Sequence, residues 1–239
     1  MINRIHNTDG VEESMTNGKL ILGTVTIGQA PRTDLIPEIK QFLGDGVEIL
    51  EAGALDGLTL AEVQKLYPDP GDNVLITRMA DGTQVKVAEK HIVPRMQGKI
   101  DRLVEQGAGV VLLACTGEFP EFECRKLLIE PNKVLFDTVK SVAPGMKLGV
   151  FIPDIDQVDY AQRRWSAVSH EVFVQAVSPY GCAGDKTAGA DRLKQAGVQV
   201  AVLDCIGYTL RDKQAVKEKL QVPVVLARSM VARVIAELL

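Results

Sequence analysis

The sequence predicts an α/β protein of two similar αβα halves, with mainly parallel sheets related by a pseudo-twofold axis and a β-hairpin inserted in the first half. The first observation is an internal duplication, because residues 107–118 (GAGVVLLACTGE) align with residues 197–208 (GVQVAVLDCIGY) at an offset of ninety. The second is that each segment carries a continuous apolar run after a glycine, which is typical of a central strand covered on both faces. The third is the dipeptide Asp81-Gly82 between two alternating runs, a hairpin signal.

Taken in order, the expected first half is residues 19–145, after a disordered tail at 1–18. It opens with the strand 20–28, which ends in a turn before an amphipathic helix that stops at Gly44. The elements expected next are a strand at 47–50, a helix capped by Thr59, a hairpin at 74–87, a helix at 91–106, the strand before Cys115, a helix at 121–128 and a strand at 134–136.

The expected second half, residues 146–239, repeats this scheme, and we allow for an exchange of C-terminal segments between the halves. Its expected elements are a strand at 146–153, a helix holding Trp165, a strand at 171–177, a helix ending at Gly197, the strand before Cys205, a helix at 211–220, a strand at 222–227 and a last helix. The first strands, at Leu22 and Leu148, are 126 residues apart, so the first half contains thirty-six extra residues. We assign the hairpin to them and expect a flap over the cleft or a dimer contact.

Length and composition fit a globular protein. With 239 residues the chain suits one large domain or two smaller ones, and the duplication favours two. A net charge of −4 provides no basic surface for nucleic acid, and no apolar run is long enough for a membrane span. The amino-terminal residues lack the apolar core of a signal peptide, and four cysteines without secretory features fit a reducing compartment. We therefore expect a cytoplasmic protein.

Cys115 and Cys205 are the candidate catalytic residues. Both follow strands, and the ligand crevice of an open α/β sheet lies at the carboxyl ends of its strands. A free cysteine is usually a small buried hydrophobe, but the duplicated position favours function. A thiolate and a thiol on opposite faces of a carbon acid can remove a proton and return it on the other side. We expect a helix N-terminus beside each cysteine to lower its pKa.

The candidate substrate-binding residues lie in the turns near these strand ends. Arg32 and Arg78 carry planar forks that match a carboxylate. The alternative for each is a solvated surface arginine, which explains Arg78 equally well and Arg32 less well. Asp56 is as well explained by a turn as by a ligand. Asp204 is expected to pair with an arginine or with backbone donors, since a lone buried carboxylate is costly. The full set of expected binding residues is Gln29, Arg32, Asp56, Arg78, Thr116, Gly117, Glu118, Ile206, Gly207 and Tyr208.

Neither a metal nor a cofactor is expected. The chain has no Cys-x-x-Cys spacing and only three histidines, which gives a structural zinc site little support. The turn after the first strand and the Gly-rich loop at 181–184 lack the G-x-G-x-x-G pattern of dinucleotide binding. The expected partners are a small carboxylate ligand and further copies of the chain, as a homodimer or a higher homo-oligomer.

Four motifs resemble those of the AroM family: TIGQAPR at 26–32, GALDGL at 53–58, CTGEF at 115–119 and LDCIGY at 203–208. The resemblance extends over almost all of residues 20–239. It implies membership of the aspartate/glutamate racemase-like superfamily of cofactor-independent two-cysteine enzymes, which includes hydantoin racemases, maleate isomerase and arylmalonate decarboxylase.

The resemblance implies a racemase or isomerase of a small, amino-acid-like carboxylate, with Cys115 and Cys205 as paired acid and base. The racemases typically follow the first cysteine with Asn-Thr and the second with Thr-His, whereas this chain has Thr-Gly and Ile-Gly. The reaction type therefore carries over better than the substrate. Two alternatives stay open: a catalytically silent binding or regulatory protein that uses the same cleft, and thiol-nucleophile chemistry such as isomerisation.

Overall fold

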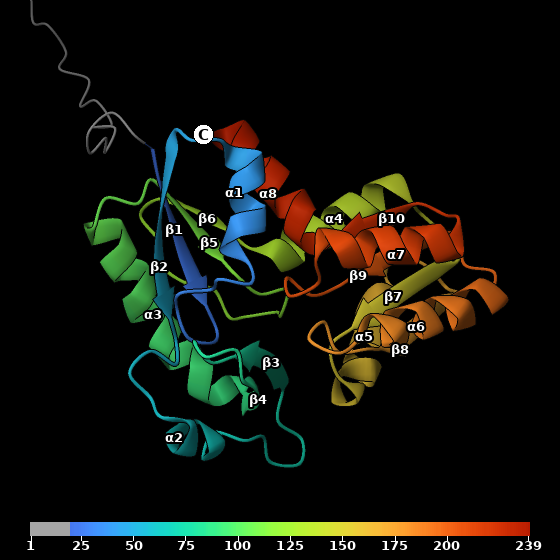
Figure 1. Ribbon diagram of the computed structural model, residues 1–239, viewed down its shortest axis with the longest axis horizontal. Coiled ribbons are helices and arrows are strands. Elements are labelled where there is room, and N and C mark those ends of the chain that lie inside the picture. The colour runs from blue at the N-terminus through green and yellow to red at the C-terminus, as the bar shows by residue number, and fades with distance from the viewer. Residues whose placement is uncertain (1–19) are drawn as a thin grey trace, which may run out of the picture.

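The computed structural model describes residues 20–239, so the tail expected at 1–18 lies outside the described residues. Two four-stranded sheets lie side by side with helices around them (Figure 1), and all strand pairs within each sheet are parallel. The α/β class and the two-half organisation predicted from the sequence are confirmed. Within residues 20–239, none of the helices is long and apolar enough to cross a membrane.

The first sheet has the strand order β2-β1-β5-β6. Helices cover both of its faces, because Ile39 and Ile100, which come from different helices, are buried in separate core clusters. The side chain of Thr59 accepts a hydrogen bond from the backbone of Glu62 and caps a short helix, as predicted. The elements of this half are β1 (Leu20–Thr26), α1 (Ile36–Leu43), β2 (Val47–Gly53), α2 (Leu60–Gln64), α3 (Glu89–Glu105), β5 (Val110–Leu113), β6 (Leu127–Ile129) and α4 (Pro131–Val142).

The second sheet has the order β10-β9-β7-β8, which is the same topology with the strands renumbered. Its elements are β7 (Leu148–Ile152), a 3₁₀ turn (Ile155–Gln157), α5 (Val158–Trp165), β8 (Val172–Ala176), α6 (Ala183–Gln195), β9 (Val200–Leu203), α7 (Leu210–Leu220), β10 (Val224–Leu226) and α8 (Ala227–Leu238). The strand register is the same in both halves. Leu22 of β1 pairs with Val110 of β5, and Leu148 of β7 pairs with Val200 of β9. These two pairs are related by the offsets of 126 and ninety found in the sequence.

The predicted hairpin is present in the first half. It consists of β3 (Val74–Arg78) and β4 (Gln84–Ala88), which pair antiparallel. Gly82 in its turn has a φ of 87°, a conformation that glycine adopts without steric cost. The Asp81-Gly82 signal therefore identified the hairpin and its turn.

The last helix of each half packs on the other sheet. Leu135 of α4 is buried in the core around β7, and Ile235 of α8 is buried in the core around β1. Helix α8 lies beside α1, although the two helices are far apart in the sequence (Figure 1). The two sheets are thus joined by exchanged helices as well as by the connection between the halves.

The stretch between Cys115 and α4 differs from the sequence-based prediction of a helix at 121–128 and a strand at 134–136. The chain is irregular until β6, and residues 134–136 lie inside α4. The side-chain amide of Gln97 in α3 donates to the carbonyl of Glu123 and accepts from its N–H, which holds this segment outside a helix. Pro131 then occupies the first turn of α4, where a missing N–H costs nothing.

The exchanged helix α8 is expected to stabilise the first half as strongly as that half's own core does. Ile235 is fully buried in the core around β1, so Ile235→Ala should lower the free energy of unfolding by about 2–5 kcal/mol. Urea denaturation monitored by circular dichroism measures this loss. Leu238, in the same helix but 47% exposed, provides the matched control, and Leu238→Ala should change stability by less than about 1 kcal/mol. Equal effects of the two changes would contradict the packing described here.

Candidate active site

The two cysteines occupy equivalent turns. Each lies two residues beyond the end of a strand, Cys115 after β5 and Cys205 after β9. The N–H of Gly117 donates to the Cys115 sulfur at 3.3 Å, and the N–H of Gly207 donates to the Cys205 sulfur at 3.4 Å. The duplication found in the sequence therefore extends to the hydrogen bonds of the sulfur atoms.

Both turns meet at one cavity. The hydroxyl of Thr116, next to Cys115, donates to the carbonyl of Asp204, next to Cys205, at 3.3 Å. The two cysteines line a cavity of about 50 Å³, together with residues from both halves and from the hairpin. The structure thus brings Cys115, Thr116, Gly117 and Cys205 of the predicted site together. Among residues 20–239 there is no group of three or more His, Cys, Asp or Glu side chains that could hold a metal ion.

Both thiols are less acidic than predicted. Burial raises the pKa of Cys205 to about 11 and that of Cys115, which is partly exposed as a residue, to about 12. The glycine N–H groups and Arg32 lower these pKa values only in part. The helix N-termini that were expected to lower the thiol pKa values do not lie beside the cysteines. Cys115 is followed by irregular chain, and Cys205 lies five residues before the start of α7.

Asp204 forms a buried ion pair beside the cavity. Its Oδ2 accepts hydrogen bonds from Nη1 of Arg164 at 3.0 Å and from the indole of Trp165 at 2.8 Å. Arg164 also donates to the carbonyl of Asn132 and stacks on the rings of Phe136 and Trp165. The sequence-based prediction that Asp204 pairs with an arginine is confirmed, and the partner is Arg164.

Three polar residues around α5 line the cavity and were missed by sequence reasoning. Gln157, Tyr160 and Arg164 all border the cysteine cavity. Their spacing of three and four residues places them on one helix face, and α5 follows β7 at the sheet edge where ligands bind. That spacing was the signal available in the sequence.

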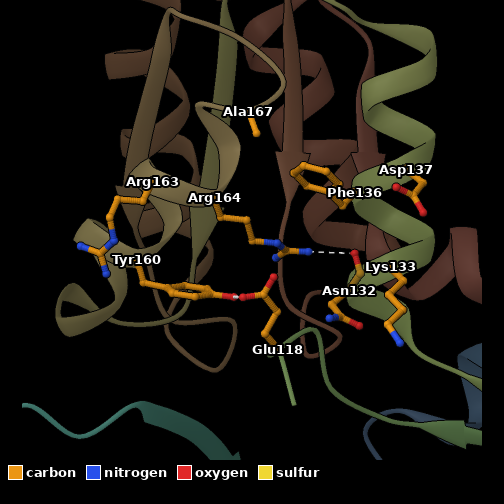
Figure 2. Close-up of a pocket in the computed structure, with 9 residues that line it drawn as sticks. All are labelled: Glu118, Asn132, Lys133, Phe136, Asp137, Tyr160, Arg163, Arg164 and Ala167. Carbon is orange, nitrogen blue, oxygen red and sulfur yellow. Dashed lines mark hydrogen bonds between the residues drawn. The ribbon is translucent and has the colours of Figure 1, made fainter. Parts of the chain in front are cut away.

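Two larger pockets adjoin the cavity, and both have Tyr160 in their walls. One, of about 490 Å³, is drawn in Figure 2, and the other has about 1060 Å³. Figure 2 shows Tyr160 of the second half and Glu118 of the first pointing toward one another, and the tyrosine hydroxyl donates to the carboxylate at 2.6 Å. Glu118, a predicted binding residue, therefore links the halves between these two pockets and does not line the cysteine cavity.

The comparison with protein families decides the membership of this chain. The sequence model described as AroM protein matches residues 22–239. The chain belongs to the AroM family. A search of curated proteins found no match.

Solved structures share the fold of this AroM-family protein at low sequence identity. Allantoin racemase from Klebsiella pneumoniae has 14% identity over 92% of this chain and 87% of that chain, with a TM-score of 0.61. Maleate cis-trans isomerase from Nocardia farcinica, bound to TRIS, has 11% identity over 91% of both chains, with a TM-score of 0.62. Aspartate racemase from Picrophilus torridus has 10% identity over 91% of this chain and 93% of that chain, with a TM-score of 0.56. The fold is thus the one that the sequence motifs implied.

Arg32 of the AroM-family chain is buried in an existing network. Its guanidinium donates two hydrogen bonds to Asp34, one to Thr26 and one to Tyr180 of the second half. Arg78 stacks over the Tyr180 ring at 4.6 Å. Neither arginine lines the cysteine cavity, so a role in holding a substrate carboxylate stays a prediction for both.

The other predicted binding residues have structural partners. The amide of Gln29 bonds to the carbonyls of Leu55 and Leu58, and the carboxylate of Asp56 accepts the N–H groups of Ala30 and Gly53. Ile206 and Tyr208 are buried in core clusters. A Cβ on Gly207 would lie 3.0 Å from the Tyr180 hydroxyl, so glycine permits this close approach. None of these residues lines the cysteine cavity.

The hairpin lies against the cavity and is bound to the second half. Leu75 and Ile76 of β3 are in the cavity wall, and Lys86 of β4 forms ion pairs of 2.8 Å with Asp154 and Asp156 beyond β7. This is the position expected of a flap, whereas the alternative of a dimer contact stays a prediction.

Lys86→Met is expected to loosen the hairpin from the second half. Losing both ion pairs should cost about 1 kcal/mol locally, which makes amide hydrogen exchange in residues 74–88 roughly fivefold faster. Hydrogen exchange read by mass spectrometry measures this. Lys90→Met is the matched control, because Lys90 pairs only with Asp69 and Asp72 of the same half. Unchanged exchange in the Lys86 variant would mean that these pairs do not anchor the hairpin.

Proposed function

We propose that this AroM-family protein is a cofactor-independent racemase or isomerase of a small carboxylate, in which Cys115 and Cys205 act as an acid/base pair. The observation that supports this most directly is that both cysteines, in equivalent turns of the two halves, line the same cavity. Folds shared with racemases and an isomerase agree with the proposal.

The proposed reaction needs one thiolate and one thiol. The thiolate takes the proton from the carbon next to the carboxylate, and the electrons of the C–H bond move into the carboxylate to form an enediolate. The opposite thiol then gives its proton to the other face of that carbon. After one turnover the cysteines have exchanged protonation states, so the protein is in the form that acts on the product enantiomer. Proton exchange of the cysteines with water restores the form that acts on the first enantiomer.

The pairing of charges near the cavity is compatible with a carboxylate ligand. Asp204 is neutralised by Arg164, and Arg32 acts electrostatically on both cysteines. In this proposal the N–H group of Thr116, directly after Cys115 in the cavity wall, binds the carboxylate and its enediolate.

A second function is favoured by the thiol pKa values. With pKa values of about 11 and 12, only roughly one Cys205 in ten thousand is ionised at pH 7 in the free protein. The second function is therefore that of a catalytically silent binding or regulatory protein. Such a protein would bind a small carboxylate in the same cavity without converting it.

Proton NMR in deuterated water separates the two functions. The panel consists of amino acids, hydantoins, maleate and malonates, and the signal followed is exchange or rearrangement at the carbon next to the carboxylate. Exchange with any member supports the enzyme. Binding without exchange for the whole panel favours the catalytically silent protein and contradicts the proposed reaction.

A further inference from the structure

Two residues that line the cysteine cavity each carry a buried acceptor without a donor. Within residues 20–239, three buried side-chain oxygens or nitrogens lack a hydrogen-bond partner, and two of these atoms belong to residues of the cysteine cavity. They are Oδ1 of Asp204 and Oε1 of Gln157. Asp204 is only 6% exposed, so bulk water does not readily replace the missing donor.

The other polar atom of each side chain already has a hydrogen-bond partner. Oδ2 of Asp204 holds Arg164 and Trp165, which leaves Oδ1 as its open oxygen. The amide nitrogen of Gln157 donates to the carbonyl of Val74 in the hairpin at 2.8 Å. That bond fixes the orientation of the amide, because its oxygen could not donate to a carbonyl. Both open atoms are therefore acceptors and neither can act as a donor.

A buried acceptor without a donor is costly, and native proteins keep few of them. Two among the residues of one cavity, from separate elements of the second half, indicate a ligand that supplies donors. The charge of Asp204 is balanced by Arg164 at 3.0 Å, so the site can hold a donor group without repelling the carboxylate of the same ligand.

We propose that the ligand is a small carboxylate that carries N–H donors, either an ammonium or a ureido group, and that Asp204 and Gln157 select it through their open oxygens. This inference rests on the proposed function and narrows its substrate class. Dicarboxylates without N–H groups leave both acceptors unpaired, and a site built around hydrogen bonds rejects such analogues strongly.

The test compares acids of the same shape that differ only in N–H groups. N-Carbamoylglycine, succinamate and levulinate share one skeleton. Succinamate has CH₂ in place of the inner N–H of N-carbamoylglycine, and levulinate also has CH₃ in place of the terminal NH₂. Alanine and isobutyrate form the corresponding ammonium pair. Isothermal titration with the full-length protein should show at least one N–H acid binding at least tenfold more tightly than its isostere, about 1.4 kcal/mol. The pair that shows the difference identifies ureido or ammonium. Equal behaviour within both sets, including no binding at all, overturns the proposal.

Variants assign the selectivity to the two side chains. Gln157→Met keeps the side-chain length and removes the acceptor, so it should reduce the N–H preference at least threefold while leaving the isostere's affinity unchanged. Gln162→Met, in the helix that directly follows Gln157, is the matched control and should have no effect, because Gln162 lines none of the three pockets. Asp204→Asn should remove the preference, provided thermal unfolding shows a folded protein. An unchanged preference in Gln157→Met overturns the role of Gln157 even if the Asp204 variant does not fold.

The binding measurements and the deuterium-exchange experiment can refute the two proposals independently. If the protein discriminates between isosteres but catalyses no deuterium exchange, the recognition of N–H groups is supported and the racemase reaction is contradicted. Deuterium exchange with acids that lack N–H groups, without discrimination in binding, keeps the reaction and removes the inference.

Discussion

Cys115→Ser and Cys205→Ser are each expected to abolish the interconversion of enantiomers, with losses of at least about a thousandfold. A serine hydroxyl is a far weaker acid than a thiol, so the altered face loses its proton-transfer group. The remaining cysteine still works on its own face, and each variant should therefore exchange deuterium into one enantiomer only, the opposite one in each case. Chiral chromatography combined with NMR in deuterated water measures both effects.

The other two cysteines provide the controls for this result. Cys182 is exposed, Cys124 packs beside the core of the first half, and neither lines the cavity. Cys182→Ser should retain full activity. Interconversion that survives in either cavity variant at the rate of the unaltered protein would exclude the two-cysteine mechanism.

The rate of deuterium exchange is expected to increase about tenfold for each pH unit between pH 7 and about pH 10. Folding raises the pKa of both thiols, so the reactive thiolate forms only as the pH approaches the value of about 11 for Cys205. The rate of interconversion between enantiomers should level off there and fall as the second thiol, near 12, also loses its proton, because that thiol is the acid. One-sided deuterium exchange needs only a thiolate and should level off without falling. Values of kcat/KM across this range measure the profile.

A matched measurement checks that the pH profile belongs to the cysteines. Cys182→Ser should have the same profile as the unaltered protein, because this exposed residue is outside the cavity. A rate that is already constant between pH 7 and 9 would show a thiolate present at neutral pH. That outcome would contradict the effect of burial described above.

The sequence predicted those parts of the fold that depend on local pattern. Apolar runs, turn glycines and the duplication located both sheets, and the hairpin followed from Asp81-Gly82. The stretch 121–136 was predicted wrongly because its conformation depends on distant residues. Gln97, in another helix, holds Glu123, and this contact has no signature in the local sequence.

The site was predictable to a similar extent. The cysteines were found because a strand end is a local feature that the duplication marks twice. Their pKa values were not, since burial depends on everything packed around the sulfurs, and the helix expected after Cys115 is absent from this part of the described chain. The cavity-lining face of α5 shows helical spacing in the sequence, but only the tertiary structure reveals that it faces the cysteines.

The exchanged helices also govern the order in which the chain can fold during its synthesis. The strands of the first sheet leave the ribosome early, but helix α8, which helps to bury Leu22 and Val110 on one face, spans residues 227–238 and follows the whole second sheet. Domains usually complete folding as units while the chain emerges. Here one apolar face of the first half, which α1 covers only in part, is not fully buried until α8 has been synthesised. The first half, although made first, should therefore complete its core only after the second sheet has been synthesised and α8 has followed it.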